Sequence, residues 1–140
     1  MKKPKGQLSL ELLLLAAAFF SFLILLLPAI REVLDTGSGG VDAKAAELFL
    51  TRANNAAERL QAFGEGSAEE VGSFALNEWK LSAEDGKIGV EINGNGFVKK
   101  IFLETGEGLE FPSTSVRGRF ALRLVKADNG VSGSVEVNNQ

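Results

Sequence analysis

The stretch LLLLAAAFFSFLILLLPAI, residues 12–30, decides the fold, because it holds no charged residue and is bounded by Glu11 and Arg31. An α-helix rises about 1.5 Å per residue, so this run would span roughly 28 Å as a helix, close to the roughly 30 Å hydrocarbon core of a bilayer. The sequence therefore predicts a helix that can cross a membrane once.

The charges on either side of this run predict its orientation. Arg31, at its end, is offset by the nearby acids Glu32 and Asp35. The start of the chain carries three uncompensated lysines: Lys2, Lys3 and Lys5. Because positive flanks stay on the cytoplasmic side, residues 1–6 are expected inside the cell and the rest of the chain outside.

The composition removes several classes of function. The 140-residue chain has room for one modest domain and a terminal segment, and it contains neither cysteine nor histidine. Disulfides, thiolates, imidazole bases and the commonest zinc or haem ligands are therefore excluded. The chain has 15 basic and 18 acidic residues; without the three leader lysines it has 12 against 18, a net charge of −6. We expect no cofactor and no nucleic-acid partner.

Glu11 is the feature that an ordinary membrane anchor does not explain. A carboxylate drawn toward the bilayer centre costs up to about 3 kcal/mol, so it should have a partner or a role. Arg31 lies too far along the helix to be that partner. Gln7 and Glu11 are four residues apart and share a helix face, so a chain beginning at Gln7 would bring its α-amino group near Glu11 of an adjacent, slightly displaced helix. The expected counter-ion is the N-terminus of a second copy.

The stretch KGQLSLELLLL, residues 5–15, resembles the class III signal peptide of archaeal type IV pilin-like proteins, whose pattern is Q-x-S-x-E-x-x-x-L. Four residues fit that pattern: Gln7, Ser9, Glu11 and Leu15. The resemblance implies that a membrane-embedded prepilin peptidase cuts between Gly6 and Gln7 and that the apolar helix is retained. The helix would serve first as a membrane anchor and then as the filament interior, with Glu11 neutralising a neighbouring subunit's amine.

The same resemblance implies a structural protein of the cell surface, in a filament that usually mediates adhesion. Its partners would be copies of itself, the prepilin peptidase, membrane lipid, and a membrane assembly platform driven by an ATPase. Two rival interpretations stay open: a membrane-anchored extracytoplasmic binding module or minor pilin, and a soluble secreted enzyme released by signal peptidase. Against the latter, the apolar run is long for a cleaved signal peptide, and Leu27 lies where a small residue is wanted.

The rest of the chain divides into predicted segments. After the leader (1–6) and the hydrophobic helix (7–34), DTGSGG at 35–40 is rich in glycine and predicts a flexible hinge that ends the helix. Pro28 should bend the helix near its outer end. Residues 41–63 predict an amphipathic helix, ended by Gly64 and Gly66. Its expected buried stripe is Val41, Ala45, Leu48 or Phe49, Ala56, Leu60 and Phe63.

Beyond residue 73 the apolar period changes to two, which predicts strands. FALNEWKL at 74–81 reads as one strand, and residues 88–92 and 97–103 form a hairpin around NGNG at 93–96. Residues 119–124 and 131–137 form another hairpin, and 109–111 a short edge piece. The predicted fold class is α+β: the head domain, 41–140, packs one face of an antiparallel sheet of about four to six strands on its helix.

Each candidate chemical site in the head has a simpler structural explanation. Trp79 should be core or a subunit contact, and Arg117, Arg119 and Arg123 should lie on a solvated strand face. Oxygen-bearing side chains that could hold calcium fall in expected turns: Asn93, Asn95, Asp128 and Asn129. The carboxylate pairs Glu84 with Asp85 and Glu107 with Glu110 form no obvious acid/base site. We predict no catalytic residue and no metal site.

Overall fold

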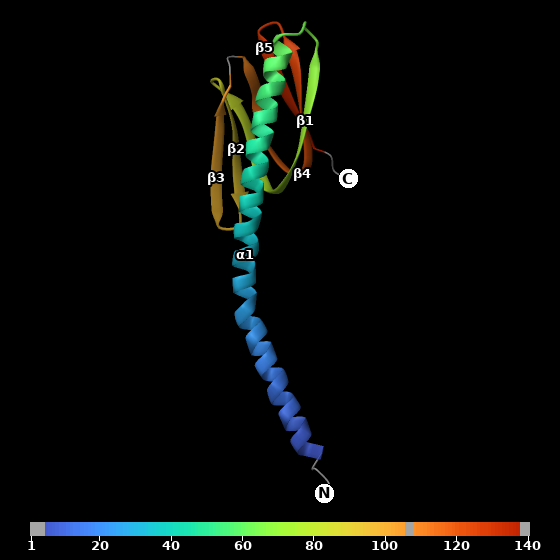
Figure 1. The fold of residues 1–140 in the computed structure, drawn as a ribbon, viewed down its shortest axis with the longest axis vertical. Coiled ribbons are helices and arrows are strands. Elements are labelled where there is room, and N and C mark those ends of the chain that lie inside the picture. The colour runs from blue at the N-terminus through green and yellow to red at the C-terminus, as the bar shows by residue number, and fades with distance from the viewer. Residues whose placement is uncertain (1–4, 106–107, 138–140) are drawn as a thin grey trace. The chain divides into compact units, whose positions relative to one another are not determined.

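The computed structural model describes residues 5–105 and 108–137, with side chains from Ser9 onward. The chain falls into two compact units, Met1–Thr36 and Gly37–Gln140. One helix, α1 (Lys5–Gln61), is followed by five strands (Figure 1): β1 (Ala68–Glu84), β2 (Lys87–Gly94), β3 (Phe97–Glu104), β4 (Leu109–Ala127) and β5 (Gly130–Val137). The fold is α+β, with a long apolar N-terminal helix ahead of an antiparallel sheet, as the sequence predicts.

The sheet of the second unit has the strand order β3-β2-β1-β4-β5, and every neighbouring pair is antiparallel. The part of α1 that belongs to this unit lies across one face of the sheet (Figure 1). We call this the inner face and the opposite one the outer face. Alternation along β1 is clear, since Val71, Ala75 and Trp79 are buried while Gly72, Phe74 and Leu76 between them are exposed. Both predicted hairpins are confirmed.

The core is one cluster between α1 and the inner face. At its centre, Phe49 of α1 meets Trp79 of β1 and Phe120 of β4 edge to face, with ring centroids 5.3–6.4 Å apart. Trp79 is completely buried, which confirms its predicted place in the core. Edge-to-face rings contribute about 0.5–1.5 kcal/mol per pair beyond the area they bury.

The predicted helix stripe is partly wrong. Val41, Leu48 and Phe63 are 59%, 51% and 59% exposed. Phe49, Ala56 and Leu60 are buried as predicted. The rest of the buried face runs through Ala43, Ala46, Leu50, Ala53 and Ala57. Two stripes of helical period coexist in this segment, and the choice between Leu48 and Phe49 depends on the partner rings of Trp79 and Phe120, which are distant in sequence.

The predicted break at residues 35–40 is also wrong, because α1 continues through this segment as a helix. Gly39 shows why a glycine is needed here. A Cβ on Gly39 would lie 2.8 Å from Cζ of Phe97, so the ring occupies the space that a side chain would take. The glycine serves close packing against the β2–β3 hairpin. The boundary between the two units, Thr36 and Gly37, nevertheless falls inside this segment.

The prediction of a separate edge piece at residues 109–111 is wrong. These residues are the beginning of β4, a strand of 19 residues. Pro112 would be unexpected inside a central strand, because proline cannot donate to the ladder. The β1–β4 register shifts at this point, between the pairs Leu81↔Thr114 and Ala83↔Phe111, so the irregularity accommodates Pro112.

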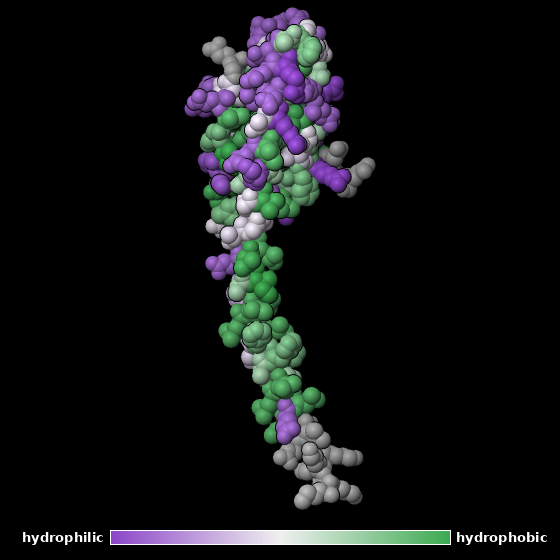
Figure 2. Space-filling view, viewed as in Figure 1, coloured by the Kyte–Doolittle hydropathy of each residue, from purple (hydrophilic) through white to green (hydrophobic). Residues whose placement is uncertain are grey.

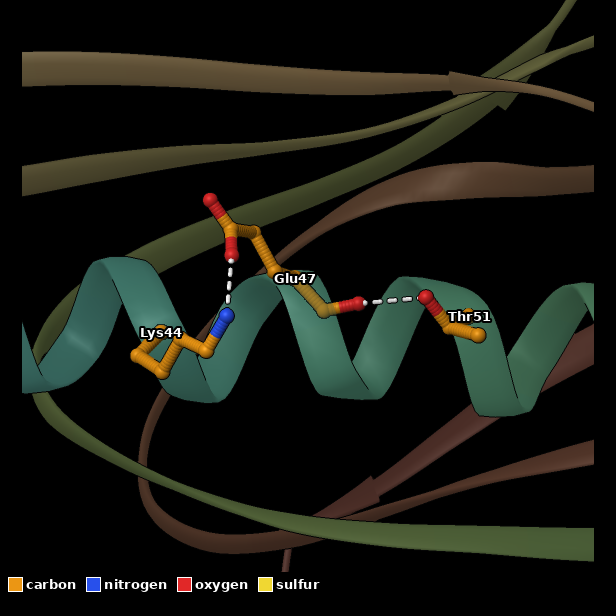
Figure 3. Close-up of polar contacts among 3 residues, drawn as sticks. All are labelled: Lys44, Glu47 and Thr51. Carbon is orange, nitrogen blue, oxygen red and sulfur yellow. Dashed lines mark hydrogen bonds and ion pairs between the residues drawn. The ribbon is translucent and has the colours of Figure 1, made fainter.

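The solvent-facing side of α1 in this unit is polar. Lys44 Nζ donates to Glu47 Oε2 over 3.0 Å, and Thr51 Oγ1 donates to the Glu47 carbonyl oxygen over 2.9 Å (Figure 3). Both contacts are exposed and local, so they contribute little to stability. The helix ends at Gln61, before the predicted glycines. The backbone N–H groups of Ala62 and Phe63 then donate to carbonyl oxygens three residues earlier, in a turn.

Candidate functional site

The apolar side chains of the N-terminal unit are not covered by any other part of the chain that the structure describes. Leu12, Phe19 and Leu25 are 69%, 59% and 78% exposed, and the large hydrophobic residues around them are similar. Figure 2 shows hydrophobic residues over nearly the whole visible side of this unit. An exposed apolar surface of this extent marks contact with lipid or with other protein.

By length and composition this helix can cross a membrane, and it is the one such helix among the residues that the structure describes. A helix satisfies its backbone N–H and C=O groups internally, which hydrocarbon requires. The hydroxyl of Ser21 follows the same rule, since its Oγ donates to the carbonyl oxygen of Ala17 over 2.8 Å. Pro28 lies inside α1, and the helix continues beyond it; the bend at Pro28 stays a prediction.

The residues that fit the expected Q-x-S-x-E-x-x-x-L pattern lie at the start of α1. Ser9, Glu11 and Leu15 are exposed on the helix. Gly6 and Gln7 belong to its first turns, but the side chains of Lys5 to Leu8 are outside the description. The other leader lysines, Lys2 and Lys3, also lie outside the described residues.

Glu11 has no basic partner in the described part of the chain. The ion pairs found there are Lys44–Glu47, Arg59–Glu69 and Lys100–Glu91, all in the second unit. Its neighbours along α1 are leucines. An exposed carboxylate therefore stands at the beginning of an exposed apolar surface.

The head-domain candidates remain apart from one another. Arg117, Arg119 and Arg123 are exposed on β4, as predicted for a solvated face. Asn95 and the pair Asp128–Asn129 lie at the β2–β3 and β4–β5 turns. Among the described residues no group of three or more acidic side chains could hold a metal ion. Glu107 lies outside the described residues.

The sequence analysis missed Asp42, the one buried charged residue of the described core. Its carboxylate accepts hydrogen bonds from the backbone N–H of Leu76 at 2.9 Å and of Asn77 at 2.8 Å. It also accepts from the side-chain Nδ2 of Asn77 at 2.8 Å. These residues lie where the β1–β4 register shifts. The sequence did hold a signal for this burial. Asp42 lies four residues before Ala46 and seven before Phe49, so it shares the helix face on which both are buried.

Searches against protein-family models, curated proteins and solved structures find no match to this chain.

Proposed function

We propose that this protein is a structural subunit of a type IV pilus-like cell-surface filament. The observation that carries the proposal is the exposed carboxylate of Glu11 at the start of an exposed apolar helix long enough to cross a membrane. A simple anchor needs the apolar helix but gains nothing from the acid, which costs free energy at the edge of a bilayer. A subunit that packs its helix beside identical helices can pair the acid with a neighbour's N-terminal amine.

The basic leader fits the same proposal. While the leader is present, its lysines hold the N-terminus at the cytoplasmic face, and the head unit lies outside. Extracting the uncleaved helix would desolvate those charges and crowd them together in a bundle. Cleavage between Gly6 and Gln7 by a prepilin peptidase removes them and creates the amine that Glu11 requires.

The apolar helix can then exchange lipid for other copies of itself, since its backbone is satisfied in either surrounding. An assembly platform and its ATPase would supply the work of extraction. The head unit, with its own core, would face the solvent. Its role would be adhesion, and it would not act as an enzyme.

N-terminal sequencing of the protein purified from its cells tests the processing step. We expect the mature chain to begin at Gln7. A mature chain that retains Lys2, Lys3 and Lys5 would contradict the proposal, and one that begins after Ala29 would identify a product released by signal peptidase.

Substitution of Glu11 tests assembly. We expect Glu11→Gln to be processed and inserted normally but to lose filaments in electron micrographs of the cell surface, because the neighbour's amine keeps its charge without a counter-ion. Glu32→Gln, which removes an exposed acid from the same helix beyond the apolar run, is the matched control and should assemble. Normal filaments from Glu11→Gln would contradict the assembly role. If the native protein forms no filaments, it is a membrane-anchored binding module instead.

A further inference from the structure

β1 is the central strand of the sheet, but the first half of β1 is paired on one side only and so leaves an open edge. On one side, β1 pairs with β4 from Ala68 onward. On the other side, its pairing with β2 begins only at Glu78. Among the residues that the structure describes, no strand therefore lies beside Ala68–Phe74 on the β2 side, over roughly 23 Å at about 3.3 Å per residue.

The hydrogen bonds fix which backbone groups face this edge. Lys126 N donates to Ser67 O, so the odd-numbered residues that follow Ser67 in β1 exchange their bonds with β4. The even-numbered residues point the other way. Leu76 confirms this alternation, since its N–H is taken by Asp42 on the open side. The N–H and C=O groups of Glu70, Gly72 and Phe74 are therefore directed to the open edge.

A shallow hollow of about 230 Å³ lies beside this edge. It is lined by Arg52, Asn55 and Arg59 of α1 and by Glu69–Gly72 of β1. Arg59 is held by Glu69, and this hydrogen bond raises the pKa of its guanidinium. Arg52 is exposed and enters no ion pair among the described residues. Arg52 thus offers a positive charge on the inner side of the open edge, in a hollow that Glu69 and Glu70 also line.

The outer side of the same edge is apolar at its Phe74 end, whereas Glu70 places an exposed acid at the other end. Phe74 and Leu76 lie there, 49% and 41% exposed. A strand that suits this edge would carry apolar residues toward Phe74 and Leu76 and an acid toward Arg52.

The chain's own edge strands differ in how well they meet that requirement. β3 carries Lys99 and Lys100, charges of the kind that keep an edge from pairing. β5, with the sequence GVSGSVEV, has neither lysine nor proline, and its single charge is Glu136. Val131 N donates to Gly108 O, away from the β4 residues with which β5 forms its main ladder, so odd-numbered β5 residues face outward. Leu109 and Glu110 pair with Val131 and Ser132 on this outward side, and Phe111 lies close to Gly133. Among the described residues, the outward groups without a strand partner are therefore those of Val135 and Val137.

We propose that the open edge of β1 in one copy accepts β5 of a second copy as an antiparallel strand. Residues whose backbone groups bond to each other across an antiparallel pair lie opposite and project on the same side. Gly72 and Phe74 would therefore share a side with Val135 and Val137 of the second copy. Its Ser134 and Glu136 would project to the other side, toward Arg52. The two patterns are complementary only in the antiparallel arrangement, because parallel pairing shifts the alternation by one residue.

This contact joins two different surfaces, so each copy can give β5 to one neighbour and receive it from another. Such head-to-tail contacts produce helical filaments where the rotation between copies does not close a ring, and they do not form two-fold dimers. The inference rests on the proposed function, since it adds a contact between head units to the assembly of the helices. Main-chain bonds would supply affinity and the alternating side chains specificity.

Cross-linking of the full chain tests the contact. The native protein has no cysteine, so introduced thiols are unique. Gly72→Cys is sterically open, as a Cβ there comes no closer than 3.8 Å to another atom, and Val137 is 41% exposed. Within one chain these positions project from opposite sides of the sheet. We expect membranes or filaments of the Gly72→Cys/Val137→Cys variant, treated with a short bismaleimide, to give a ladder of covalent oligomers on a denaturing gel.

The controls separate this contact from random collision. Either single variant should give at most dimers. The pair Val98→Cys/Val137→Cys, which moves the first thiol to an equally open residue of β3, should lose the ladder. A second pair, Glu70→Cys/Val137→Cys, leaves Gly72 unchanged and should also give a ladder. Adding Gly72→Pro to this second pair should abolish its ladder, because the N–H that the proline removes faces the open edge and not β4.

The outcomes distinguish this inference from the proposed function. Filaments without a ladder would overturn the strand contact and leave the filament proposal in place. A ladder from a protein that never forms filaments would support the contact and overturn the filament proposal. An equal ladder from the Val98 control would also overturn the contact.

Discussion

Asp42 shows how one side chain can secure an irregular strand. At the irregularity of β1 between Ala75 and Trp79, the N–H groups of Leu76 and Asn77 have no strand partner, and partly buried backbone donors without partners are costly. The Asp42 carboxylate takes both. Because Asp42 belongs to α1, the same bonds fasten the helix to the sheet.

Removing this carboxylate should destabilise the second unit strongly. We expect Asp42→Ala to lower the free energy of unfolding by about 3 kcal/mol, since it leaves two backbone N–H donors and a side-chain amide without a hydrogen-bond acceptor. Asp42→Asn should lose less, because one amide oxygen can still accept. Urea unfolding followed by Trp79 fluorescence measures both. Glu47→Ala, which removes an exposed acid from the same helix, should change stability by less than about 1 kcal/mol. Equal losses from the two alanine variants would contradict this role of Asp42.

At the scale of elements, the glycines of residues 35–40 have different roles within one helix. Gly39 makes room for the Phe97 ring, which also lies against Gly94. Gly40 has no atom near the position of an added Cβ. Composition alone treats the two glycines alike, and packing separates them.

Alanine substitutions should therefore act in opposite directions. Gly40→Ala should raise the free energy of unfolding by up to about 1 kcal/mol through helix propensity. Gly39→Ala gains the same propensity but forces Cβ to within 2.8 Å of Phe97 Cζ. Overpacking costs about 1–3 kcal/mol, so the net result should be a loss of about 1 kcal/mol. In a Phe97→Ala background the Gly39→Ala loss should become a gain, measured by urea unfolding of all four combinations. A Gly39→Ala loss that persists in that background would show that Phe97 is not its cause.

The elements that the sequence predicts well are those with an unambiguous period. The alternation at 88–103 and 119–137 and the uncharged run at 12–30 each allow one assignment, and the structure confirms the strands and the helix. The wrong predictions fall where the local sequence allows two structures and a residue distant in sequence determines which one forms. Phe97 turns a helix-breaking glycine into a packing site, and Trp79 with Phe120 selects Phe49 over Leu48. Asp42 was missed because its partners, Leu76 and Asn77, have no pattern that marks them as unpaired donors.

At the scale of the whole molecule, the two units differ in what surrounds their apolar side chains. The N-terminal unit exposes its apolar side chains, whereas the second unit buries most of its own in one core, with exceptions such as Phe63, Phe74 and Val98. Every buried residue of that core lies beyond Gly37. Its stability should therefore not depend on the apolar helix, which is what a head unit requires if it is to remain folded both before and after the helix changes its surroundings.

A fragment Gly37–Gln140 should accordingly fold alone in water. We expect cooperative urea unfolding, reported by the fluorescence of Trp79, the single tryptophan, with a midpoint equal to that of the full chain in detergent micelles. The Asp42→Ala change should lower the midpoint of both by the same amount, because the bonds that it removes lie within the fragment. If the fragment unfolded without a cooperative transition, or the substitution affected only one of the two proteins, the core would depend on the apolar helix after all. The two units could not then act as independent parts.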